Sequence, residues 1–305
     1  MLSYALRRLI IGVLVMFVVS GITFTLTNAA IDPARAIAGE GATSDDVEAI
    51  RKSYGFDRPL AARYVAWLGQ ALQGDLGSSY RQRRPVVDVI MERLPVTLKL
   101  GGLALAFALV LSIPLAIAAA LRPNSWIDRI ALLFALFGQA MPTFWFALLG
   151  IVVFSVNLRW LPASGSGTTA HFILPAIALG YYAAPTLMRL MRAGMIDVLA
   201  SDYIRTARAK GLSEARVVLK HALRNAVLPV VSVAAVQFGF MLGGSVVIET
   251  IFAMQGVGYL AWESISLSDL PVTQAIVLMI SLIYIVLTLS ADLLNAWLDP
   301  RIRIG

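Results

Sequence analysis

The sequence predicts an all-α integral membrane protein with six transmembrane helices. Of its 305 residues, 59% are hydrophobic and only 14% are charged, whereas about 25% of the residues of a soluble domain are charged. A hydrocarbon core about 30 Å thick requires about 20 consecutive apolar residues of helix. Six uncharged stretches reach that length, namely 9–31, 100–121, 130–158, 160–188, 225–248 and 270–291.

Two of these stretches need interpretation. The first could be a cleaved signal peptide, but its apolar core of about 20 residues exceeds the usual ~7–15, and no small-x-small cleavage site follows it. We therefore expect it to remain as a transmembrane helix. The fourth opens with the polar, glycine-rich PASGSGTTAH, so its helix is expected to run from about Phe172 to about Arg192.

The distribution of Lys and Arg predicts the orientation of the bundle, because short loops rich in these residues stay in the cytoplasm. The segment 189–224 holds eight of them against three acids, whereas the loop 249–269 holds none and the loop around Trp160 holds only Arg159. Segment 189–224 and both termini are therefore expected in the cytoplasm. Because the net charge of +7 reflects this topology, no nucleic-acid partner is expected.

The external segment 32–94 is expected to form a small helical cap. Thr43 precedes a stretch with acidic residues in its first turn and apolar residues at helical spacing, and a second periodic stretch follows at 63–72. The apolar positions are Val47, Ile50 and Tyr54 in the first stretch and Tyr64, Leu68 and Leu72 in the second. Such periodicity is not typical of a disordered linker.

Catalytic chemistry is missing from the sequence. An ATP-binding loop needs glycines followed by Lys-Ser or Lys-Thr, but the Lys-Ser pair at Lys52 has Arg51 in place of the glycine. No HExxH or GxSxG motif occurs. With no cysteine and only two distant histidines, His171 and His221, no catalytic or metal site is expected, and a membrane-embedded enzyme is disfavoured.

Titratable residues are also missing from the span centres. Ion-coupled carriers usually hold such a residue at membrane depth, because moving protons or cations needs a charged partner there. Glu249 and Asp292 lie at span ends, where we expect them to be solvated. An ion-coupled secondary carrier is therefore disfavoured.

The segment 201–229 predicts a helix, a glycine turn and a second helix at the cytoplasmic surface. Ser201 can cap the first helix and Gly211 can end it in a left-handed turn. Ser213 can cap the second helix, with Glu214 in its first turn.

Two roles remain open for the first of these helices. Ala207 and Ala209 are small enough to let a partner protein approach closely, and Arg205, Arg208 and Lys210 would offer it positive charge. Alternatively, the helix could lie as an amphipathic surface helix on anionic lipid.

The stretch YIRTARAKGLSEARVVLKHALRNAVLP, residues 203–229, resembles the EAA loop of the dipeptide/oligopeptide (peptide/nickel) ABC importer permease family. In that loop a short coupling helix docks into a cleft of the ATPase subunit, so the resemblance implies that Ala207 faces the ATPase. Arg205, Thr206 and Ala207 stand where the general consensus has Glu-Ala-Ala. The implied coupling-loop residues are Tyr203, Arg205, Thr206, Ala207, Arg208, Ala209, Lys210, Gly211 and Leu212.

Four further stretches resemble the same family, so the resemblance covers nearly the whole chain. They are MLSYALRRLI, YGFDRPLAARYVAWLGQALQGDLGSSY, GGSVVIETIFAMQGVGYLAWESISLSDLPVTQ and ADLLNAWLDPRIR. Met254 and Gln255 stand where many relatives have Trp-Pro, so a change in local shape or in substrate contacts is expected there.

The resemblance implies the type I ABC importer permease fold, with a small helical extracytoplasmic segment between helices 1 and 2. The implied parts are the N-terminal tail and first helix at 1–31, the extracytoplasmic segment at 32–94, the transmembrane core at 95–293 with its coupling loop at 194–226, and a cytoplasmic tail at 294–305.

The resemblance also implies a function. The chain would be a non-catalytic permease subunit of the bacterial inner membrane that forms half of a path for di- to oligopeptides. Its partners would be a second homologous permease, two ATPase subunits that bind ATP and Mg, and an extracytoplasmic binding protein, with no cofactor in this chain. Nickel chelates, glutathione or another solute remain alternative cargoes.

Uncharged polar residues at membrane depth, Gln139 and Gln237, are the candidates for lining the path. Prolines that interrupt or flank spans free backbone groups, which a neighbour or a water-filled cavity can satisfy. These prolines are Pro114, Pro142, Pro175, Pro185 and Pro229. Gly239 and Gly243 form a GxxxG pair that is expected to pack helices within the subunit.

Overall fold

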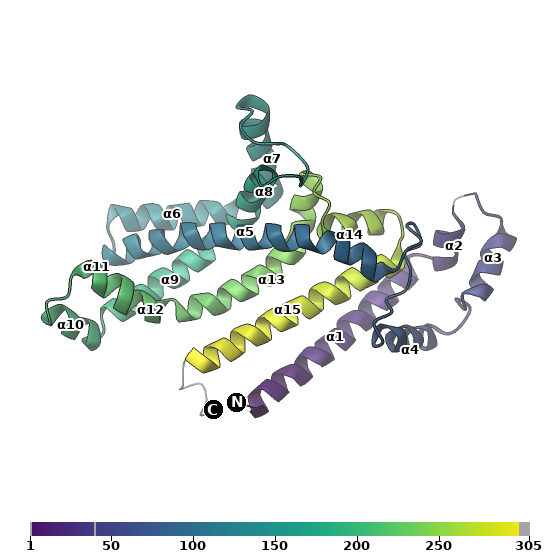
Figure 1. Cartoon of the computed structure of the whole chain (residues 1–305), viewed down its shortest axis with the longest axis horizontal. Helices are drawn as coiled ribbons and strands as arrows, with labels where there is room; N and C mark the ends of the chain where they lie inside the picture. The colour runs from purple at the N-terminus through teal and green to yellow at the C-terminus, as the bar shows by residue number, and fades with distance from the viewer. Residues whose placement is uncertain (1, 40, 299–305) are drawn as a thin grey trace.

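The computed structural model describes residues 2–39 and 41–298, and its helices form an elongated bundle (Figure 1). Four helices are long and apolar enough to cross a membrane by themselves. They are α1 (Leu2–Ala30), α5 (Val86–Leu121), α13 (Leu228–Ile251) and α15 (Leu270–Leu298).

Two further spans are broken into pairs of helices. The third is α6 (Trp126–Ala140), bent by 99° from α7 (Thr143–Gly150) and the π-helix η1 (Ile151–Asn157). The fourth is α8 (Ala170–Gly180), bent by 60° from α9 (Ala184–Leu199). Counting each bent pair as one span gives six, which confirms the predicted all-helical membrane fold.

Prolines explain the position of both breaks. Pro142 directly precedes α7, and Pro185 lies in the first turn of α9. Proline has no backbone N–H to donate, and it disfavours helical geometry in the preceding residue. Pro229 likewise starts α13, whereas Pro114 and Pro175 lie inside α5 and α8 without ending them, so only three of the five predicted prolines flank a helix.

Two helices extend beyond the apolar stretches that predicted them. α5 begins at Val86, inside the segment expected to be wholly external, because Val86, Val89 and Ile90 are buried against α14 (Val257–Ser266) and α15. α15 runs to Leu298, so the expected C-terminal tail begins as helix, and its residues 299–305 lie outside the described residues.

Small residues let the central helices approach closely. A Cβ at Gly180 would lie 2.3 Å from the carbonyl oxygen of Ala104, so only glycine permits this contact between α8 and α5. Gly239 packs against Tyr284 of α15, where a Cβ would lie 2.5 Å from the ring, whereas a Cβ at Gly243 would meet nothing within 4 Å. The predicted internal packing therefore applies to Gly239 alone.

The external cap consists of α2 (Pro33–Ala38), α3 (Ser44–Ser53) and α4 (Leu60–Ala71). Thr43 caps α3 as its acidic first turn predicts: its side chain accepts from the Asp46 N–H at 3.3 Å, and the Asp46 carboxylate accepts from the Thr43 N–H at 3.1 Å.

α4 joins the cap to the first span. Tyr64 packs edge-on against Phe17 and Phe24 of α1, and its hydroxyl lies 2.8 Å from that of Ser20. Leu72, the last of the predicted apolar positions, directly follows α4 and is 81% exposed, so it does not take part in this contact.

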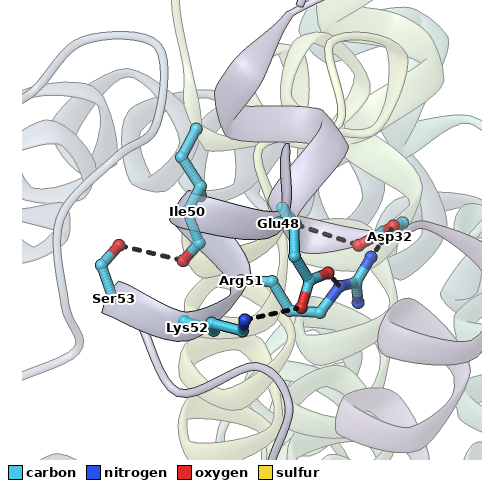
Figure 2. A network of polar contacts seen from close by, with 7 residues as sticks. Asp32, Glu48, Ile50, Arg51, Lys52 and Ser53 are labelled. Carbon is cyan, nitrogen blue, oxygen red and sulfur yellow. Dashed lines mark hydrogen bonds and ion pairs between the residues drawn. The ribbon is translucent and has the colours of Figure 1, made fainter. Parts of the chain in front are cut away.

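An ion-pair network holds α3 against the start of α2, where Asp32 is the N-cap residue (Figure 2). Arg51 donates to Asp32 at 2.6 Å and lies 3.3 Å from Glu48. Burial raises the pKa of Asp32, but the hydrogen bonds from Arg51 and from the Ala34 N–H outweigh it and hold that pKa below its usual value. This network therefore joins two helices of the cap, whereas the contact of the cap with the first span is made by α4.

The bundle has two distinct ends (Figure 1). The cap and α14 lie at one end. The short helices α10 (Asp202–Ala209), α11 (Glu214–Arg216) and α12 (Leu223–Ala226), with the π-helix η2 (Val217–Ala222) between the last two, lie at the other.

Candidate functional site

The segment after α9 has the predicted helix, glycine turn and helix. α10 ends before Gly211, which has a φ of 77° in the left-handed region that glycine adopts without strain. Ser201 and Ser213 occupy the two N-cap positions, but neither side chain makes the expected capping bond. The Ser201 hydroxyl instead donates to the carbonyl of Val198 at 2.6 Å.

α10 has one face buried in the chain's own core. Ile204 is fully buried and Ala207 is 8% exposed, and both belong to the main hydrophobic cluster of the bundle. The expectation that Ala207 faces a partner is therefore wrong. The residues of the predicted coupling loop that are exposed are Tyr203, Arg205, Thr206, Arg208, Ala209, Lys210 and Gly211, whereas Leu212 is half-buried.

A bidentate ion pair spans the glycine turn. Arg208 donates to both carboxylate oxygens of Glu214, at 2.6 and 3.1 Å. This hydrogen bonding holds the pKa of Glu214 below its usual value. Arg205 lies 3.3 Å from Asp202 on the surface, and Lys210 makes no ion pair among the residues that the structure describes. Arg208 therefore braces α10 against α11 rather than standing free for a partner.

A second ion pair joins the third span to the helix that leads into α10. Asp128 of α6 is 2% exposed, and both its oxygens accept from Arg192 of α9 at 2.6 Å. The Asn124 N–H donates to the same carboxylate at 2.9 Å. In the sequence, Arg192 is only one of the basic residues that predict the orientation of the bundle. No local sequence pattern links it to Asp128.

The two helix breaks lie against each other. The Tyr181 hydroxyl, at the break before α9, donates to the carbonyl of Met141 at the break before α7, at 2.6 Å. The rings of Tyr181 and Phe146 stack with centroids 4.1 Å apart. This hydrogen bond satisfies a carbonyl that the broken helix leaves unpaired, as a non-helical segment at membrane depth requires.

A pocket of about 770 Å³ opens at these breaks and brings the two predicted pathway candidates together. Gln139 and Gln237 both line it, together with Tyr182 and Thr186. The Gln139 amide donates to the Thr186 hydroxyl at 3.1 Å. The remaining lining residues are Ala140, Met141, Pro142, Thr143, Phe144, Leu179, Ala183, Phe240, Met241 and Gly244.

The pocket lies near the middle of the spans. Gln139 follows Trp126 by 13 residues of α6, a rise of about 20 Å, and Gln237 follows Leu228 by 9 residues of α13, a rise of about 14 Å. Both helices start at the end of the bundle that carries α10 (Figure 1). Gln139 is the fourteenth residue of the third span (126–157) and Gln237 the tenth of α13, so both lie in the interior of their spans rather than at the ends.

Glu249, near the opposite end of α13, is not solvated as expected. It is 0% exposed, and its carboxyl oxygens accept from the Thr97 hydroxyl at 2.7 Å and from the Tyr259 N–H at 2.9 Å. The Val257 N–H donates to the Thr97 oxygen at 2.8 Å. A Cβ at Gly256 would lie 2.4 Å from Glu249 Oε2, so the loop packs directly on this carboxyl group.

The remaining predicted loop and span-end residues also have partners. Met254 is fully buried in the main core, and Gln255 accepts a hydrogen bond from Arg93 of α5. Asp292 is half-buried and pairs with Arg8 of α1 at 3.2 Å, so the expectation that it is simply solvated is wrong. Both hydrogen-bonded pairs join elements that are distant in the sequence, so no local sequence pattern predicted the partner of Gln255 or of Asp292.

Comparison with known proteins identifies the family. The family described as "Binding-protein-dependent transport system inner membrane component" matches residues 112–304, and its companion described as "Binding-prot-dependent transport system membrane comp, N-term" matches residues 1–101. The glutathione transport system permease protein GsiC of Escherichia coli O6:H1 is 43% identical over 304 residues, covering 99% of both chains, and that of strain K12 is 42% identical over the same length.

A solved structure has the same fold. The MetNI methionine ABC transporter, in inward-facing conformations, matches 70% of this chain and 97% of its own with a TM-score of 0.57, at 15% sequence identity. The matched families cover both halves of the chain, and the fold agrees with them. The chain therefore belongs to the family of binding-protein-dependent transport system inner membrane components, as the non-catalytic permease subunit of an ABC importer.

Proposed function

We propose that this permease forms half of the path through which an ABC importer carries short peptides, and that a tripeptide of the size of glutathione is among its cargoes. The observation that supports this most is the 43% identity, over 99% of both chains, to a permease named for glutathione transport. Glutathione is itself a short peptide, so the identity also supports the broader cargo class.

The family implies ATPase and binding-protein partners. The proposed assembly contains a second homologous permease, two ATPase subunits that bind ATP and Mg, and an extracytoplasmic binding protein that delivers cargo. Within this chain, 1–31 forms the tail and first span, 32–94 the external segment, 95–293 the transport core and 294–305 the cytoplasmic tail. The coupling loop is 194–226.

The exposed face of α10 is the proposed ATPase contact. Thr206 and Ala209 lie on that face, whereas Ile204 and Ala207 fix the helix to the bundle from the opposite side. A movement of α10 would reach α9 through η2, which contacts both helices, and from α9 the Asp128–Arg192 pair leads to α6 and the pocket. ATP hydrolysis in the ATPase subunits would thus be coupled to the access of cargo to the pocket, without covalent chemistry in this chain.

The orientation is testable by cysteine labelling, because the chain has no cysteine of its own. The basic loops predict that α10 and both termini face the cytoplasm. Single cysteines at the exposed Ser78 and Ser266 should therefore react with an impermeant thiol reagent in intact cells, and one at Ser213 only after permeabilisation. Labelling of Ser213 from outside would invert the topology.

The cargo is testable by deleting the gene in a strain without redundant peptide importers. We expect uptake of glutathione or of another class of short peptide to be lost and to return with the wild-type gene. Normal uptake of all short peptides, with loss of nickel or another solute, would contradict the peptide assignment and leave only the importer assignment.

A further inference from the structure

We infer that the pocket at the two helix breaks is a transit site that binds the backbone amide groups of a passing peptide through uncharged hydrogen-bonding side chains. The inference rests on the proposed peptide cargo. It assigns a recognition chemistry to this part of the path.

The first observation is the composition of the lining. Its polar side chains are Gln139, Thr143, Tyr182, Thr186 and Gln237, and it includes no Asp, Glu, Lys, Arg or His. Other buried charges of the span ends, such as Glu249 and Asp128, are engaged in internal bonds away from it. The site therefore offers hydrogen bonds without a net charge.

The second observation is that these polar groups are accessible at membrane depth. Tyr182 is 52% exposed, Gln139 is exposed and Gln237 is half-buried. Exposing amide and hydroxyl groups to hydrocarbon is costly, because lipid offers them no hydrogen bonds. Their accessibility indicates that this face of the bundle lines an aqueous path rather than contacting lipid.

The third observation is the hydrogen-bonding capacity that remains. A glutamine amide carries an acceptor oxygen and two N–H donors, the same groups that a peptide bond presents. Gln139 uses one donor on Thr186, and Gln237 makes no hydrogen bond within the part of the chain that the structure describes. The two side chains thus leave acceptors and donors free to pair with a peptide backbone.

A binding site without charged side chains allows a peptide to be released more readily than a charged site does. A conduction path needs binding favourable enough for entry and weak enough for release. A fixed Arg or Lys would hold the terminal carboxylate of a peptide strongly, because charge-assisted hydrogen bonds are about twice as strong as neutral ones. Hydrogen bonds to backbone amides are common to all peptides, so this site would pass short peptides of varied side chains.

The test uses the importer purified with its partner subunits, reconstituted in proteoliposomes and supplied with loaded binding protein. Gln139→Leu and Gln237→Leu should each lower the maximal uptake rate about three- to tenfold, because each removes hydrogen bonds to cargo. The cargo concentration at half-maximal uptake should stay unchanged. Gln274→Leu is the matched control: Gln274 lies in α15, is buried and does not line the pocket, so uptake should stay within about twofold.

Gln237→Glu provides a readout that is independent of protein level. With two tripeptides that the wild type imports, one anionic and one neutral, this variant should slow the anionic tripeptide selectively, because it places a negative charge in the site. Equal rates for both peptides, together with wild-type rates in the two leucine variants, would overturn the inference and leave the peptide function standing. Failure of the wild type to import any short peptide would overturn both.

Discussion

Replacing Ala209 with tryptophan should leave the permease in the membrane and abolish most ATP-driven uptake. Ala209 lies on the exposed face of α10, outside the spans. If that face fits a cleft of an ATPase subunit, the large side chain overpacks the contact at a cost of about 1–3 kcal/mol. ATPase association should therefore weaken about tenfold to a hundredfold, as measured by co-purification at graded concentrations.

Ala207→Trp is the contrasting variant. Ala207 is buried in the core of this chain, so tryptophan there should displace α10 and lower the amount of folded permease. Ala209→Trp should not lower it. If α10 instead lay on anionic lipid, Ala209→Trp would deepen membrane contact and leave ATPase association unchanged. Normal association and uptake in Ala209→Trp would rule out the docking face.

Gly211 supplies a second probe of the same segment. Valine at a φ of 77° is strained, because a β-branched residue fits the left-handed region poorly, whereas asparagine tolerates it. No atom would obstruct a new Cβ, so the backbone alone decides the outcome. Gly211→Val should impair coupling and Gly211→Asn should retain most of it.

Replacing Glu249 with alanine should strongly destabilise the external half of the chain. The carboxyl group is fully buried, and its loss leaves the Thr97 hydroxyl and the Tyr259 N–H without an acceptor. Each unsatisfied donor costs about 1–3 kcal/mol, so about 2–6 kcal/mol is expected for the two. The loop before α14 should loosen, and the thermal unfolding midpoint of the detergent-purified permease should fall by about 5–20 °C.

Glu92→Ala is the matched control for this prediction. Glu92 lies at the same end of the bundle and pairs with Arg84, but both side chains are exposed to solvent. Surface ion pairs contribute about 0–1 kcal/mol, so the unfolding midpoint should change little. Equal midpoints for Glu249→Ala and the wild type would contradict the assigned role of the buried carboxyl group.

The sequence predicted the features that arise from local pattern. The lengths of the uncharged stretches predicted the six spans, and the acidic residues after Thr43 predicted the capped helix. The glycine at position 211 predicted the left-handed turn. Gln139 and Gln237 are candidates for lining the path because they are uncharged polar residues at membrane depth, and both line one pocket.

Features set by contacts between distant residues were missed. The small size of Ala207 and the family resemblance predict that it faces a partner, but Ile204, three residues earlier on the same face, is buried in the core of this chain, and so is Ala207. Glu249 was expected to be solvated because it ends a span, yet its acceptors are filled by Thr97, which lies 152 residues away in the sequence. The Asp128–Arg192 pair joins residues 64 positions apart, and neither has a local signature.

Site-specific photo-crosslinking from α10 tests the central claim most directly, because it reports which face of this helix meets the ATPase. A photoreactive residue placed at the exposed Thr206 or at the buried Ala207 would be activated in the assembled importer, in membranes. We predict a crosslink to an ATPase subunit from position 206 and crosslinks within the permease from position 207. Crosslinks from position 206 to lipid alone, or to an ATPase subunit only from position 207, would contradict the account.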